Sequence, residues 1–189
     1  MRKIVLLMHV SIDGFVAGPA GEMDWIRFSG DVWEYVESIT GEADTALYGA
    51  NTYAMMESHW PTAADAPQAT KRDIDHARWA NNVEQIAFST QLEATRWANS
   101  RIVREDVAKE MGELKSRPGT NLLMLGSPTL AQSFMRLEPI DEFRLNVNPV
   151  ALGGGIALFD GLEGHVDLDL VGTRVFTTGV VGLHYQTVR

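Results

Sequence analysis

The chain has 189 residues, of which 45% are hydrophobic, and this length fits one domain, residues 1–189, with a substantial core. Its formal net charge is −9 without any run of Lys or Arg, which argues against a nucleic-acid partner. The absence of cysteine excludes disulfides, thiolate metal sites and cysteine nucleophiles. No apolar run approaches the roughly 18 residues of a membrane helix, and the N-terminal run is too short for a signal peptide. We therefore expect a cytoplasmic protein without a membrane partner.

The first strand is predicted at Lys3–Val10, a nearly continuous apolar run typical of a strand that is buried on both faces. Ser11–Gly30 is rich in glycine and is expected to form a long loop, and loops of that length in compact domains usually serve a function. The remaining strands are predicted at Ala43–Tyr48, Gln85–Ser89, Arg101–Val103, Asn121–Leu125, Glu142–Asn148, Leu168–Val175 and Val180–Val188.

Helices are predicted between these strands from their capping residues. Asp31 is expected to cap a helix that runs to about Thr40, and Asn51 to cap the next, which follows Gly49. A further helix begins near Asp106. Residues 59–80 are polar and are predicted to be a surface insertion that ends in a short helix.

The segment after the strand Asn121–Leu125 points to a ligand. Gly126 ends the apolar run, Ser127 stands at the position of a helix N-cap, and Pro128 stands at the first helical position. A strand that turns through glycine into a helix leaves free N–H groups and the positive end of the helix dipole, which suits a diphosphate. The full dinucleotide fingerprint and the P-loop sequence are both absent.

The order of elements predicts an α/β fold, because strands alternate with helices through most of the chain and a hairpin through Thr177–Gly179 closes it. We expect a mostly parallel central sheet with this C-terminal antiparallel hairpin.

Four motifs carry a resemblance over nearly the whole length: SIDGFVAG (Ser11–Gly18) followed by Asp24-Trp25, ALYGANTYAMM (Ala46–Met56), LGSPTLAQSF (Leu125–Phe134) and IDEFRLNVNPVALGGGIALF (Ile140–Phe159). With them the chain resembles the reductase domain of the bacterial riboflavin-biosynthesis deaminase–reductase and, more broadly, the three-layer dihydrofolate reductase fold. The zinc-binding deaminase half of that enzyme has no counterpart here, since its His and Cys ligand motifs are missing.

The resemblance implies an NADPH-dependent reductase that forms a homodimer. It places the diphosphate between the helix N-termini after Gly49 and Gly126, and the adenosine end at the turn that begins with Ser89. Relatives often have Arg at the position of Ala50, so Arg104 is the alternative cation for the 2′-phosphate. The cofactor-binding residues implied are Val16, Ala17, Gly49, Asn51, Thr52, Ser89, Thr90, Arg104, Gly126, Ser127, Thr129 and Leu130.

The candidates for a proton donor are Asp13, Asp31 and His9. Asp13 lies in the first motif, where substrate should meet nicotinamide, and its alternative is an aspartate that only stabilises a turn. Asp31 stands near the position of the substrate carboxylate of dihydrofolate reductases, and its alternative is a plain N-cap. A satisfied core histidine is the alternative for His9. The histidines lack the spacing of metal ligands, so no metal is expected.

The preferred function is reduction of a small heterocyclic or carbonyl/imine substrate, closest to that of 5-amino-6-(5-phosphoribosylamino)uracil reductase. The alternatives are a non-catalytic nucleotide-binding protein on the same scaffold and dihydrofolate reductase proper, because a fold does not fix a function.

Overall fold

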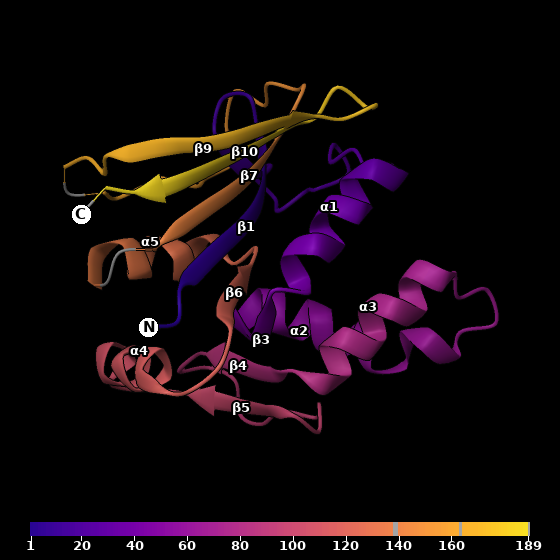
Figure 1. Ribbon diagram of the computed structural model, residues 1–189, viewed down its shortest axis with the longest axis vertical. Helices are drawn as coiled ribbons and strands as arrows, with labels where there is room; N and C mark the ends of the chain where they lie inside the picture. The colour runs from indigo at the N-terminus through magenta and orange to yellow at the C-terminus, as the bar shows by residue number, and fades with distance from the viewer. Residues whose placement is uncertain (138–139, 163, 189) are drawn as a thin grey trace.

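Figure 1 shows a computed structural model of the protein, which describes residues 1–137, 140–162 and 164–188. Its centre is an eight-stranded sheet in the order β5-β4-β3-β6-β1-β7-β10-β9. The pairs from β5 to β7 are parallel, and β10 is antiparallel to both β7 and β9. The predicted fold class is therefore confirmed. The strands of this sheet are β1 (Ile4–Ser11), β3 (Ala43–Gly49), β4 (Glu84–Phe88), β5 (Ser100–Val103), β6 (Asn121–Leu125), β7 (Glu142–Asn148), β9 (Leu168–Val175) and β10 (Val181–Thr187).

Helices cover both faces of the sheet and make three layers (Figure 1). Side chains alternate between the faces along a strand, so one strand serves two cores. Leu6 of β1 belongs to the same buried cluster as Phe134, whereas Leu7 belongs to the cluster that contains Val36 and Ala80. The helices are α1 (Gly30–Thr40), α2 (Ala50–His59), η1 (Trp60–Asp65, a 3-10 helix), α3 (Lys71–Asn82), α4 (Val107–Ser116) and α5 (Pro128–Leu137).

Two predicted helix caps are wrong. The N-cap of α1 is Ser29 and that of α2 is Gly49, which puts Asp31 and Asn51 inside the first turn of their helices. The reason for Asp31 is tertiary: its carboxylate accepts a hydrogen bond from the backbone N–H of Thr177, at 2.8 Å, in the turn of the β9–β10 hairpin.

The loop predicted at Ser11–Gly30 contains a short strand, β2 (Phe15–Ala17), which pairs with β8 (Ile156–Ala157) in a second, two-stranded sheet. Gly155 allows this pairing, because a Cβ atom at that position would lie 2.2 Å from the carbonyl oxygen of Ala17. The glycine cluster before β8 is thus a site of close backbone approach.

The helix predicted at the end of residues 59–80 is present as α3, but the segment is not merely an insertion on the surface. These residues form η1 and most of α3, and α3 buries His76, Ala77 and Ala80. Thr70 and Asp73 make a reciprocal capping box at the start of α3, with two hydrogen bonds between side chain and backbone. Of the helices in the described ranges, none is long and apolar enough to cross a membrane.

Candidate functional site

A cleft of about 880 Å³ opens at the carboxyl ends of the parallel strands. It is lined by the ends of β1, β3, β4, β5 and β6, at His9, Gly49, Phe88, Val103 and Leu125. In open α/β sheets this edge is where ligands bind, since the loops and helix N-termini that follow the strands converge there.

The two glycine bends that the sequence singles out lie side by side in this cleft. The backbone N–H of Gly49 donates to the hydroxyl of Ser127 at 3.0 Å, and a Cβ on Gly126 would lie 3.6 Å from Cγ2 of Thr52. Because Gly49 is the N-cap of α2, the N–H groups in the first turn of this helix receive no capping side chain. The expected proximity of the two bends is thus confirmed.

Ser127 has a strained backbone that the sequence did not predict. Gly126 and Ser127 both adopt left-handed conformations, with φ of 58° and 62°, and a non-glycine residue rarely does so. The carbonyl of Ser127 accepts the N–H of Ala131, which places it as N-cap of α5, as predicted. Its hydroxyl does not cap α5; it links Gly49 to the carbonyl of Leu125. We call this arrangement the Ser127 clasp.

All twelve residues that the resemblance implies for the cofactor line the same cleft. At its β4–β5 end, the hydroxyl of Ser89 accepts the N–H groups of Gln91 and Leu92, each at 3.0 Å, and so organises the turn. Arg104 also lines this end and donates to the carbonyl of Glu93 at 3.0 Å. Their contact with a nucleotide stays a prediction.

Asp13 is absent from the cleft lining, so far as the described residues define it, and its carboxylate stabilises a turn. It accepts from the hydroxyl of Ser11 at 2.6 Å and from the N–H groups of Leu152 and Gly153, the latter at 2.7 Å. These bonds, the one from Ser11 first, lower the pKa of Asp13 to about 2. The geometry therefore favours the alternative interpretation, a structural aspartate.

Asp31 is likewise missing from the described lining. Its carboxylate binds the Ser29 hydroxyl, the N–H of Thr177 and the Thr177 hydroxyl. The bond from Ser29 and those from Thr177 lower the pKa of Asp31 to about 2. The side chain thus joins the start of α1 to the hairpin turn. The geometry does not favour Asp31 as a proton donor.

His9 lies in the cleft, but it is not a satisfied core histidine. Its Nδ1 atom is buried without a hydrogen-bond partner among the described residues, and the same holds for Nδ1 of His76. Burial lowers the pKa of each imidazole to about 4, so both rings are neutral at pH 7.

Sequence reasoning missed the aromatic side chains beside these histidines. Phe28, Trp33 and Trp60 line the cleft, whereas Trp25, which follows the first motif, donates to the carbonyl of Glu22. The sequence alone does not indicate which aromatic residues line a pocket, so these three could be recognised only from the fold.

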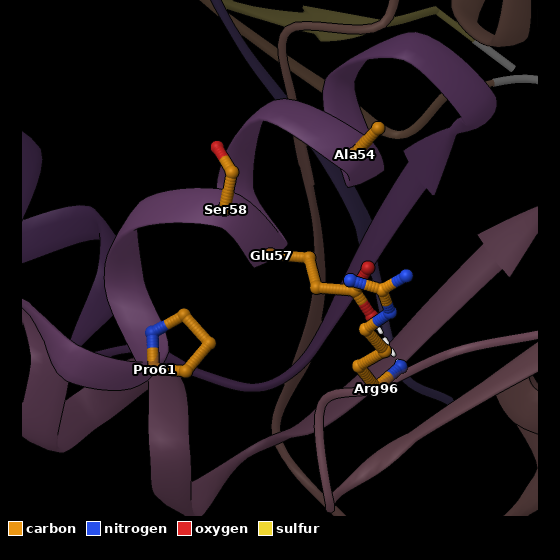
Figure 2. A pocket seen from close by; sticks show the side chains of 5 residues that line it. All are labelled: Ala54, Glu57, Ser58, Pro61 and Arg96. Carbon is orange, nitrogen blue, oxygen red and sulfur yellow. Dashed lines mark hydrogen bonds between the residues drawn. The ribbon is translucent and has the colours of Figure 1, made fainter.

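A second hollow, of about 330 Å³, is bordered by α2, by η1 and by the segment before β5, and Figure 2 shows it. Glu57 is one of its lining residues, and the Glu57 carboxylate accepts hydrogen bonds from the hydroxyl of Tyr53 and from the backbone N–H groups of Arg96 and Trp97. These bonds tie the segment before β5 to α2, so Glu57 has a structural task. The lining residues are Ala54, Glu57, Ser58, Pro61 and Arg96.

Comparison with known proteins places this fold and cleft in a family. The model of the RibD C-terminal domain matches residues 2–182. The uncharacterized protein YyaP of Bacillus subtilis (strain 168) is 31% identical over 188 residues, which cover 98% of this chain and 95% of the relative.

Two solved structures share the fold. One, from Shewanella sp. PV-4 and provisionally named for riboflavin biosynthesis, has a TM-score of 0.77 at 19% identity over 100% of both chains. The other is the diaminohydroxyphosphoribosylaminopyrimidine deaminase/5-amino-6-(5-phosphoribosylamino)uracil reductase of Thermotoga maritima, with a TM-score of 0.68 at 16% identity over 99% of this chain and 57% of that one. This chain belongs to the RibD C-terminal domain family, as its four motifs predict.

Proposed function

We propose that the protein is an NADPH-dependent reductase of a small heterocyclic or carbonyl/imine compound. One observation carries the proposal: the bends at Gly49 and Gly126 adjoin, and the two helices that follow them begin at one cleft. Family membership adds to it, because a fold relative from Thermotoga maritima is named as a reductase of 5-amino-6-(5-phosphoribosylamino)uracil.

Different parts of the cleft offer groups that suit the different parts of a dinucleotide. The first-turn N–H groups of α2 and α5 suit the diphosphate, since two helix dipoles would share its charge. Thr52 and Thr129 line the same place and offer hydroxyl donors. At the β4–β5 end, Ser89 and Arg104 are suited to the 2′-phosphate that distinguishes NADPH from NADH.

Bound NADPH would supply a hydride from its nicotinamide C4 atom. The task of the chain is then to orient that atom and to exclude water, for which Val16 and Ala17, both buried beside the end of β1, are suited. The described lining contains no Asp or Glu. A carboxylic acid of this lining is therefore not the proton donor, and we expect a hydroxyl group, one of the two neutral imidazoles or water to supply the proton.

Dihydrofolate reductase proper receives less support from this geometry. The nearest equivalent of its substrate carboxylate is Asp31, and that side chain is bound to Ser29 and Thr177. We therefore expect antifolates of the methotrexate type to fail to bind, as measured by calorimetry in the presence of NADPH.

The decisive experiment is a nucleotide titration with a variant pair. We expect the wild type to bind NADPH more tightly than NADH, and Arg104→Gln to weaken NADPH by about tenfold or more, as loss of a charge-assisted bond does. NADH affinity should not change. Arg96→Gln is the matched control, because Arg96 lines the separate hollow of Figure 2.

Activity is then measured as loss of the NADPH absorbance with 5-amino-6-(5-phosphoribosylamino)uracil and with simple cyclic carbonyl compounds. Failure of a folded protein to bind either nucleotide would reject the reductase. Binding of NADPH without turnover of any substrate would instead favour a non-catalytic nucleotide-binding protein.

A further inference from the structure

The part of the cleft that the predicted cofactor residues leave free is walled by aromatic rings. We call it the aromatic chamber and define it by His9, Phe28, Trp33, Trp60 and His76, all of which line the cleft. None of these five is among the twelve residues predicted to hold the nucleotide. The predicted cofactor residues therefore leave the chamber open to a second ligand.

The rings of the chamber form a continuous chain of contacts. Phe28 stacks on Trp33 with centroids 4.9 Å apart and planes 23° apart, and His9 meets the edge of Phe28 at 4.8 Å. Trp33 continues to His76 at 6.3 Å, and His76 to Trp60 at 4.1 Å. Aromatic walls of this kind favour a flat ring, which can stack or meet them edge to face.

Both histidines of the chamber have a nitrogen that the protein leaves unpaired. Nδ1 of His9 and Nδ1 of His76 are buried without a partner among the described residues. His76 as a whole is only 6% exposed. Both Nδ1 atoms are closed to solvent, whereas Nε2 of each ring is not among the buried unpaired atoms, so Nε2 is the nitrogen that a ligand in the chamber could pair with. A neutral imidazole offers one N–H donor and one acceptor.

The chamber carries no formal charge at pH 7 on its described lining. Among the described residues that line the cleft, Arg104 is the one with a cationic side chain at pH 7, and it lies at the β4–β5 end. Arg72 places its guanidinium 5.4 Å from the centroid of Trp33 but is not among the cleft residues. The described lining also lacks a carboxylate, the acceptor that an amino-pteridine ring needs for its donor edge. An ionic ring would lose its hydration here without compensation.

We propose that the aromatic chamber binds a flat, uncharged ring that carries a conjugated carbonyl or imine, and that His9 and His76 determine this specificity. The proposal rests on the proposed reductase function and narrows its substrate. Reduction adds a hydride to the carbonyl carbon and a proton from water to its oxygen; the C=O π bond breaks, C–H and O–H bonds form, and NADPH becomes NADP⁺.

The test uses two probes with the same bicyclic dione: menadione, which is uncharged, and naphthoquinone sulfonate, which is an anion. Each is titrated by calorimetry into the full chain saturated with NADP⁺, which prevents turnover, and into the chain without nucleotide. We expect menadione to bind at least tenfold more tightly than the sulfonate in both titrations.

The variants His9→Phe and His76→Phe keep a ring but remove the nitrogen atoms. We expect each to weaken menadione by about three- to tenfold, the value of one neutral hydrogen bond. His165→Phe is the matched control, because His165 is exposed and does not line the cleft. Unchanged NADPH affinity in all three variants shows that they fold.

The outcomes separate the two proposals. Equal or tighter binding of the sulfonate, or menadione affinity that neither chamber variant changes, overturns the chamber proposal even when NADPH binds. In the other case NADPH does not bind, but the chain still binds menadione at least tenfold more tightly than the sulfonate and needs the two histidines to do so. The chamber proposal then stands and the proposed reductase function is rejected.

Discussion

The Ser127 clasp is the feature whose energetic effect can be worked out most closely. Ser127 is 4% exposed and Gly49 is half-buried, and Ser127→Ala removes the hydroxyl that accepts the N–H of Gly49. Leaving such a donor unpaired costs about 1–3 kcal/mol. Alanine also keeps the strain of the left-handed backbone, which is about 1–2 kcal/mol for a residue with a Cβ atom. We expect Ser127→Ala to lower the free energy of unfolding by about 2 kcal/mol.

Ser127→Gly separates the hydroxyl from the backbone. It loses the same hydrogen bond but relieves the left-handed strain, so we expect it to be about 1 kcal/mol more stable than Ser127→Ala. The control is Ser133→Ala, which removes a hydroxyl from the same cleft. The Ser133 hydroxyl bonds only within its own helix, to the carbonyl of Thr129, so the change should stay within about 0.5 kcal/mol.

Urea denaturation followed by tryptophan fluorescence measures all three variants, and NADPH titration follows for each. The expected order of stability is wild type, then the glycine variant, then the alanine variant. If the alanine variant matches the wild type, the hydroxyl does not hold the two bends together. If the glycine variant is the least stable of the three, the backbone of Ser127 is not strained.

Three further variants test other parts of the structure. Gly155→Ala places a Cβ 2.2 Å from the carbonyl of Ala17 at a φ of 138°, so we expect it to lose about 3 kcal/mol of stability in urea; a wild-type midpoint contradicts the close approach of β2 and β8. Asp13→Ala removes the acceptor of the Gly153 N–H. The pKa of Asp13 is about 2 in the folded protein against 3.8 ordinarily, so the stabilisation by its carboxylate is complete above pH 4 and is lost toward pH 2. The difference in melting temperature between the variant and the wild type should therefore shrink in acid. A constant difference argues against an ionised structural role. His76→Phe tests the opposite case. The imidazole takes up a proton near pH 6.5 in the unfolded chain but only near pH 4 in the folded protein. The free energy of unfolding of the wild type therefore falls by up to about 3 kcal/mol as the pH drops through this window, and that of the variant should fall less. Parallel curves of stability against pH for the two proteins would rule out a neutral buried ring.

The fold could be predicted because its signals are local. The apolar run of β1 and the glycine between β6 and α5 fix a strand and a strand-to-helix turn without any knowledge of distant partners. Residues Leu122–Pro128 even predicted the N-terminus of α5 correctly. The same local signal led to the correct expectation that the bends at Gly49 and Gly126 meet, once the resemblance supplied the topology.

The errors arise where a distant residue decides. Asp31 has the type and position of an N-cap, but its carboxylate also accepts from Thr177, which lies 146 residues away along the chain. The strand β2 exists because β8 pairs with it, and its three residues carry too little pattern to be recognised alone. The segment that contains α3 looked polar because only one side of that helix is buried.

The two ends of the cleft therefore differ in how far sequence can describe them. The end predicted to hold the phosphates depends on the backbone N–H groups in the first turns of α2 and α5, and a glycine before a helix signals such groups directly. The aromatic chamber depends on side chains from β1, the segment before α1, α1, η1 and α3, and no spacing rule links His9 to His76. The cofactor prediction therefore rests on backbone that the fold positions, whereas the substrate proposal rests on side chains that a fold does not fix.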